Sequence, residues 1–172
     1  MTRYVAFLRG VSPMNCRMPQ LERCFEAAGF TEVRTLLSSG NVAFTARHAI
    51  VPVLEKRIQA AMRRHLDREF LTIVRPSAYL RAIVESDPWS MLRLPDGGKR
   101  LVTFLREPHD GTPSLPLRRG QAAVLAIDRT ELHSVYVPDE PEVPAFMTLL
   151  EKTFGKDMTT RTIDTVRKCA IA

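Results

Sequence analysis

The chain has 172 residues, of which 45% are hydrophobic, and its formal net charge is +6 at pH 7. This length fits one domain or two small halves of about 85 residues, and the apolar share is enough for a hydrophobic core. No apolar run approaches the roughly 20 residues that span a bilayer. The apolar N-terminal segment is interrupted by Arg9 and has no cleavage site after it. We therefore expect a cytoplasmic protein with no membrane contact and no signal peptide.

The positive charge is concentrated in the first half of the chain. Residues 1–90 contain 13 Lys or Arg against 8 Asp or Glu, whereas residues 91–172 contain 12 against 11. A basic half favours anionic partners such as phosphate esters or nucleic acid. The alternative is that the excess arginine only solvates the surface.

Cysteine and histidine usage gives no sign of a disulfide framework or a metal centre. The three cysteines, Cys16, Cys24 and Cys169, cannot all pair, and none forms a C-x-x-C motif, so we expect reduced cytoplasmic thiols. The four histidines are scattered without zinc-ligand spacing. We predict no metal site and no cofactor.

The first half shows the order β-α-β-β-α-β, which is that of a ferredoxin-like split βαβ unit. Its first strand has apolar residues on both faces, which indicates a central strand that is buried on both sides. Pro19 suits the first turn of a helix and Gly29 its end, while Gly40 and Asn41 suit a hairpin turn. The predicted segments are strand 3–9, loop 10–17, the helix from Pro19, strands 33–37 and 42–45, an amphipathic helix 54–65, and strand 70–74.

The second half repeats this order less completely. A helix over 78–85 leads to strand 101–105, a Pro-rich stretch with one short helix, strands 122–127 and 132–137, and a helix closed by Gly155. No final strand is visible, and Thr160 is placed to cap a last helix. The predicted fold class is therefore α+β, with two ferredoxin-like (βαββα) halves, the second incomplete and closed by a C-terminal helix. The predicted halves are 1–90 and 91–172; one compact unit with a continuous mixed sheet is the alternative.

Four stretches, residues 4–11, 29–35, 39–44 and 159–161 ahead of 165–166, together resemble the bacterial domain-of-unknown-function 1697 family. The resemblance implies an α+β fold with ferredoxin-like subdomains, and no established activity. Family members usually carry a glycine-rich Asn-Val-Gly-Gly loop after the Arg-Gly pair, where this chain has residues 11–15 without glycine. They also have Gln where this chain has Ser38, and Asn-Trp where it has Thr162-Ile163.

The candidate ligand site is an anion site built on the loop after the first strand. A helix N-terminus offers N–H groups and a positive dipole, and Arg9 adds a guanidinium that can grip phosphate or carboxylate. Each segment also has an ordinary structural explanation, as a loop, a hairpin turn or a helix cap. The anion candidates are Arg9, Gly10, Ser12, Ser39, Gly40, Asn41, Thr160 and Arg161.

No catalytic residue is predicted. Cys16 lies in a polar loop and is the best thiol candidate, but no histidine is placed as its base. Asp87 before Pro88 fits a turn better than an acid catalyst. An RNA-recognition sheet would use Tyr4 to stack a base, although residues 40–45 lack the aromatic spacing of that module. We expect a binding or interaction module for a phosphate-containing ligand or nucleic acid; the alternative is an enzyme acting on a phosphorylated metabolite.

Overall fold

The computed structural model describes all residues, 1–172, and contains two antiparallel sheets and five helices. The chain divides into two compact units, residues 1–82 with 167–172, and residues 83–166. The division therefore falls before residue 90, and the last six residues belong with the first unit. No helix is both long and apolar enough to cross a membrane.

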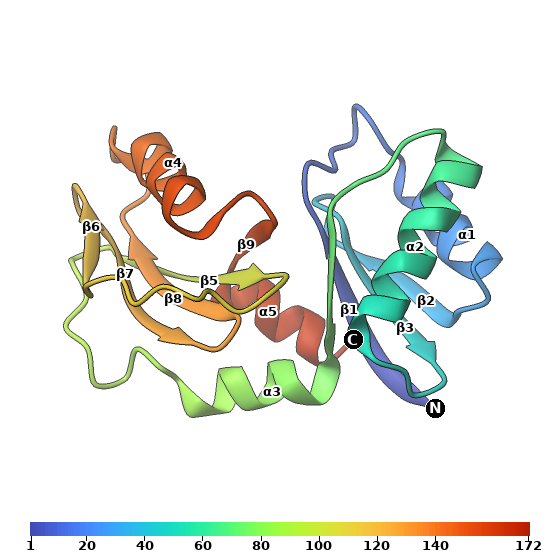
Figure 1. Ribbon diagram of the computed structural model, residues 1–172, viewed down its shortest axis with the longest axis horizontal. Coiled ribbons are helices and arrows are strands. Elements are labelled where there is room, and N and C mark those ends of the chain that lie inside the picture. Colours follow the sequence, from blue (N-terminus) through green and yellow to red (C-terminus); the bar gives the residue numbers. More distant parts are fainter. The chain divides into compact units, whose positions relative to one another are not determined.

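The first unit has the predicted β-α-β-β-α-β order. Its four-stranded sheet runs β2-β3-β1-β4, and α1 and α2 cover one face of it (Figure 1). The elements are β1 (Thr2–Leu8), α1 (Met18–Ala27), β2 (Thr31–Leu36), β3 (Asn41–Ala46), α2 (Val51–Leu66) and β4 (Thr72–Pro76), followed by α3 (Ser77–Ser86), which continues into the second unit.

The core of the first unit explains why these segments fold together. Alternate residues of β1 pack with the apolar faces of both helices, as in the cluster of Leu8, Phe25, Phe44 and Ile58. Val5 and Phe7, which point to the other face of β1, are also fully buried. The prediction that this strand is central and buried on both sides is confirmed.

Two glutamates of the helices each accept a hydrogen bond from a backbone N–H group of an edge strand of this sheet. Glu22 of α1 accepts a hydrogen bond from the Thr35 N–H on β2 at 2.9 Å, and Glu55 of α2 accepts one from the Val74 N–H on β4 at 2.9 Å. An edge strand with free N–H groups can recruit another strand, and these carboxylates occupy such groups.

The second unit differs from its prediction in two places. Its five-stranded sheet runs β6-β7-β8-β5-β9. The Pro-rich stretch forms no helix and is followed by the short strand β6, and a final strand exists where none was predicted, so both expectations were wrong. The elements are β5 (Lys99–Leu105), β6 (Leu117–Arg119), β7 (Ala122–Asp128), β8 (Glu131–Tyr136), α4 (Val143–Phe154), β9 (Met158–Thr162) and α5 (Ile163–Ala170).

The final strand also corrects the predicted helix cap. Thr160 lies within β9, paired with Thr103 of β5, rather than at a helix start. The cap role falls to Thr162, whose hydroxyl accepts a hydrogen bond from the Thr165 N–H at 3.3 Å. A serine or threonine at this position satisfies a first-turn N–H that has no intrahelical partner. The second half is therefore incomplete at its first helix, not at its last strand.

Candidate functional site

The loop after β1 and the hairpin turn between β2 and β3 lie against each other. The Leu8 N–H donates to the Gly40 carbonyl at 2.8 Å, and the Arg9 N–H donates to the Leu71 carbonyl at 2.9 Å. One end of the first unit's sheet therefore collects the loop 9–17, the turn 37–40 and the segment that leads into β4. The sequence-predicted candidates Arg9, Gly10, Ser12, Ser39, Gly40 and Asn41 are brought together here.

The backbone of loop 9–17 is largely engaged in its own hydrogen bonds. Asn15 organises it: its side-chain oxygen accepts the Ser12 N–H at 2.9 Å, and its side-chain amide donates to the Gly10 carbonyl at 2.7 Å. The N–H groups of Asn15 and Cys16 both donate to the Ser12 carbonyl. Few loop amides remain for an anion, so any grip must come chiefly from side chains.

Gly40 is required by its surroundings. Its φ is +76°, and a Cβ there would lie 2.8 Å from the Cβ of Val11 and 3.1 Å from that of Leu8. A side chain at this position would be strained in its backbone and would also collide with the loop. Glycine is thus what allows the turn and the loop to approach.

Asn41 is fully buried and acts within the turn. Its side-chain amide donates to the Leu36 carbonyl at 2.9 Å and to the Ser39 hydroxyl at 3.1 Å. Such side-chain bonds to nearby groups are typical of asparagine in turns. The turn explanation of Ser39, Gly40 and Asn41 is confirmed, and a ligand role for them stays a prediction.

Thr160 and Arg161 belong to β9 of the second unit, so they are described apart from the loop site. The Thr160 hydroxyl lies 2.8 Å from that of Thr103. The Arg161 guanidinium donates to the Thr159 hydroxyl at 2.7 Å and to the Thr160 carbonyl at 2.9 Å. These bonds orient Arg161 along its own strand, and its ligand role stays a prediction.

Two further arginines flank the loop and were not among the predicted site residues. Arg17 is exposed and immediately precedes α1. Arg68 is exposed and close enough to act electrostatically on the Cys16 thiol. Their signal in the sequence was weak, because an arginine just before or after a helix is common on any surface.

Cys16 does not have the surroundings of a nucleophile. Its side chain is 5% exposed and packs in the core, whereas a polar loop environment was expected. Burial raises the pKa of Cys16, although the charge of Arg68 acts in the opposite direction. Cys24 behaves alike, since burial, assisted by Cys16, raises its pKa to about 11. A thiol that stays protonated is a poor nucleophile at neutral pH.

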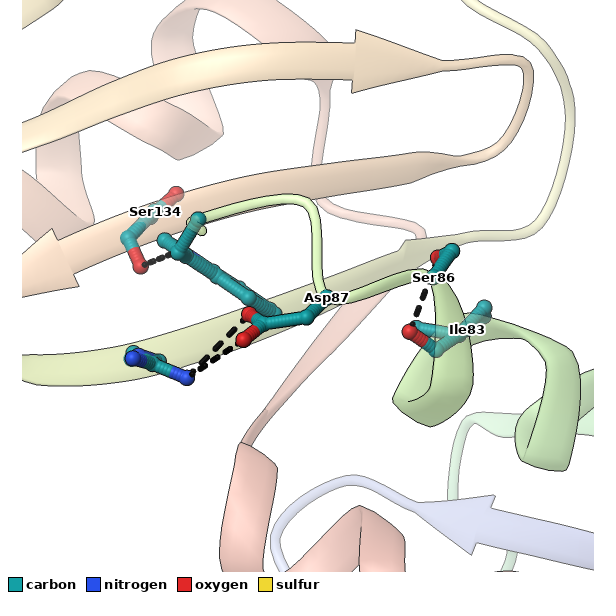
Figure 2. A network of polar contacts seen from close by, with 6 residues as sticks. Ile83, Ser86, Asp87 and Ser134 are labelled. Carbon is teal, nitrogen blue, oxygen red and sulfur yellow. Dashed lines mark hydrogen bonds and ion pairs between the residues drawn. The ribbon is translucent and has the colours of Figure 1, made fainter. Parts of the chain in front are cut away.

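Two other sequence-based hypotheses are settled by burial and pairing. Tyr4 is 1% exposed and stacks on Phe44 with ring centroids 5.7 Å apart, so it offers no face to a nucleobase and the base-stacking hypothesis was wrong. Asp87 follows α3 and accepts two hydrogen bonds from the Arg100 guanidinium, at 3.1 and 3.3 Å (Figure 2). The structural explanation of Asp87 is confirmed.

Fold and residues together describe an α+β protein with two antiparallel sheets and an arginine-flanked loop at one end of the first sheet. The chain belongs to the family described as protein of unknown function (DUF1697), whose model matches residues 1–132. Its fold is similar to that of the conserved bacterial protein SP0830 from Streptococcus pneumoniae, with a TM-score of 0.75. The two share 19% sequence identity, and the match covers 99% of this chain and 97% of that one. A comparison with curated proteins finds no match.

Proposed function

We propose that this protein is a binding module for an anionic, phosphate-containing ligand, held at the loop 9–17 end of the first unit. The observation that carries the proposal is that three arginines flank one loop. Arg9 begins the loop, Arg17 ends it, and Arg68 acts on Cys16 within it. Guanidinium groups bind phosphate through paired, charge-assisted hydrogen bonds.

The alternative, an enzyme acting on a phosphorylated metabolite, would need a reactive group at the same loop. Cys16 is the titratable thiol there, and burial raises its pKa. That direction weighs against nucleophilic catalysis and favours binding as the function. Nucleic acid remains the other anionic partner, and it would engage the same arginines through its phosphates.

We also infer that both units are ferredoxin-like and that the protein works in the cytoplasm. The strand order β2-β3-β1-β4 recurs as β7-β8-β5-β9, with β6 added at the edge. This repetition supports the ferredoxin-like description. The cytoplasmic location is supported by three buried cysteines, none of which forms a disulfide.

Isothermal titration with inorganic pyrophosphate tests the binding proposal. The variant Arg9→Ala should bind about tenfold more weakly or worse, because one charge-assisted hydrogen bond contributes roughly 1.5–3 kcal/mol. Arg68→Ala should weaken binding in the same direction. Arg23→Ala removes the same charge from an exposed position on α1 and serves as the matched control.

Two results would overturn the proposal. If the wild-type protein binds neither pyrophosphate nor a short oligonucleotide at low ionic strength, the proposed anionic ligand class is wrong. Equal weakening by Arg9→Ala and Arg23→Ala would show that only net charge matters and that the loop is not the site. The salt dependence of oligonucleotide binding separates nucleic acid from a small ligand, because each phosphate contact releases counterions.

A further inference from the structure

A second basic hollow lies at the other end of the first unit's sheet. β1 begins there, with Thr2 paired to Ala46 at the end of β3. The hollow has a volume of about 390 Å³. It is lined by the end of β3 and the segment after it, by α2, and by two further residues: 46–49, Val53, Leu54, Arg57, Met1 and Gly29. This volume lies within the range of small-molecule sites in proteins.

The hollow contains three basic side chains and no acidic one. Arg47, His48 and Arg57 line it, and no Asp or Glu does. None of the three makes a hydrogen bond or an ion pair with another residue of the chain. Grouped cations in a concave surface create a positive potential that attracts anions.

Other arginines of the chain show that such pairing is available elsewhere. Arg63 pairs with Glu69, Arg100 with Asp87, and Arg119 with Glu142. The three basic side chains of the hollow have no such carboxylate partners. Their donors therefore face solvent, where they are free to bind a ligand.

Arg57 is held in place by its own surroundings. Its guanidinium carbon lies 4.7 Å from the centroid of the Phe30 ring, and Phe30 belongs to the core. The same guanidinium lies against Gly29, where an added Cβ would be only 2.5 Å from Nη2 of Arg57. Stacking on an aromatic face orients a guanidinium without using its N–H donors. An oriented donor loses less entropy when it binds a ligand.

The backbone beside Arg47 and His48 is also tied to the core. The Tyr4 hydroxyl lies 3.4 Å from both the carbonyl oxygen and the nitrogen of Ala49. Two residues later α2 begins, at Val51, and the positive end of its dipole faces the same region. The segment that carries two of the three basic side chains therefore has a fixed position next to α2.

We propose that this hollow is a binding site for a compact, multiply charged anion of the phosphate or diphosphate class, gripped by Arg47, His48 and Arg57. The proposal rests on the hollow and on the unpaired guanidinium groups of Arg47 and Arg57, and it stands whether or not the loop 9–17 binds a ligand. Arg57 supplies the oriented donor, while Arg47 and His48 supply further donors from the segment after β3.

The test is pyrophosphate titration of the full chain at low ionic strength, with amide NMR shifts as the site-resolved readout. Wild type should show saturable shifts at residues 46–57. Arg57→Ala and Arg47→Ala should each raise the dissociation constant read at these amides by about tenfold or more. Lys56→Ala is the matched control, since Lys56 is exposed on the same helix and does not line the hollow; it should change the constant less than about twofold.

Arg57→Lys guards against a purely structural effect, because it keeps the charge and loses the forked donor. It should bind more weakly than wild type while melting at a similar temperature. The proposal is overturned if Lys56→Ala weakens binding as much as Arg57→Ala, or if no saturable shift occurs at residues 46–57. A response at residues 9–17 that is lost in Arg9→Ala reports on the loop alone, so the two sites can fail separately.

Discussion

The two ends of the first unit's sheet use their polar groups in opposite ways. At the loop end, the side chains of Asn15 and Asn41 make hydrogen bonds within the loop and the turn, and Gly40 packs tightly against Val11. At the other end, Arg47 and Arg57 have no hydrogen-bonding partner within the chain. Residues that look like a motif are thus engaged in building the turn, whereas the cations with free donors lie where no motif marks them.

The largest effect on unfolding free energy should come from substituting a glycine at the loop end. Gly40 and Gly10 both have positive φ, +76° and +83°, but only a Cβ at Gly40 meets neighbours within 4 Å. Gly10→Ala should cost about 1–2 kcal/mol of unfolding free energy from backbone strain alone. Gly40→Ala should cost roughly 3 kcal/mol or more, because a collision with Val11 adds to the strain. Urea denaturation measures both, and equal losses would contradict the tight fit.

A smaller effect on unfolding free energy is expected at a buried polar group of the second unit. His133 is 3% exposed, and its Nδ1 has no hydrogen-bonding partner. Trp89 packs edge-on against its ring, with centroids 5.2 Å apart. Burial lowers the pKa of His133, although the charges of Glu131 and Asp128 act in the opposite direction.

The pH dependence follows from that direction. The unfolded chain binds a proton at His133 more readily than the folded one, because the folded pKa lies below the ordinary value of 6.5. Unfolding free energy should therefore be highest above that ordinary value and should fall as the pH drops below it. His133→Leu should flatten this slope in urea denaturation between about pH 5 and 7. A slope that survives in His133→Leu would show that another group titrates.

Much of the first unit could be predicted from the sequence, because its signals are local. The alternation in residues 3–9, Pro19 and Gly29 around α1, and the Gly40-Asn41 turn each act through neighbouring residues. β9 could not be predicted, since its residues Met158–Thr162 are mostly polar and become a strand through pairing with β5. Tertiary pairing of this kind overrides local propensity.

The candidate sites likewise differ in whether local sequence or tertiary packing forms them. Sequence reasoning predicted that the turn and the Arg9 loop matter, and the structure shows them in contact through Leu8 and Gly40. It did not predict the second hollow, because Arg47 and Arg57 are ten positions apart and approach only when α2 packs on the sheet. The orientation of Arg57 by Phe30 is likewise a product of packing.

The most direct test of an anion-binding first unit is a residue-resolved titration of isotope-labelled protein with pyrophosphate. We expect saturable amide shifts in two separate groups, residues 9–17 and residues 46–57, with little change over residues 83–166. Arg9→Ala should raise the dissociation constant read from the first group, and Arg57→Ala that read from the second, each by about tenfold or more. Small shifts that never saturate and that spread over exposed arginines of both units would contradict it.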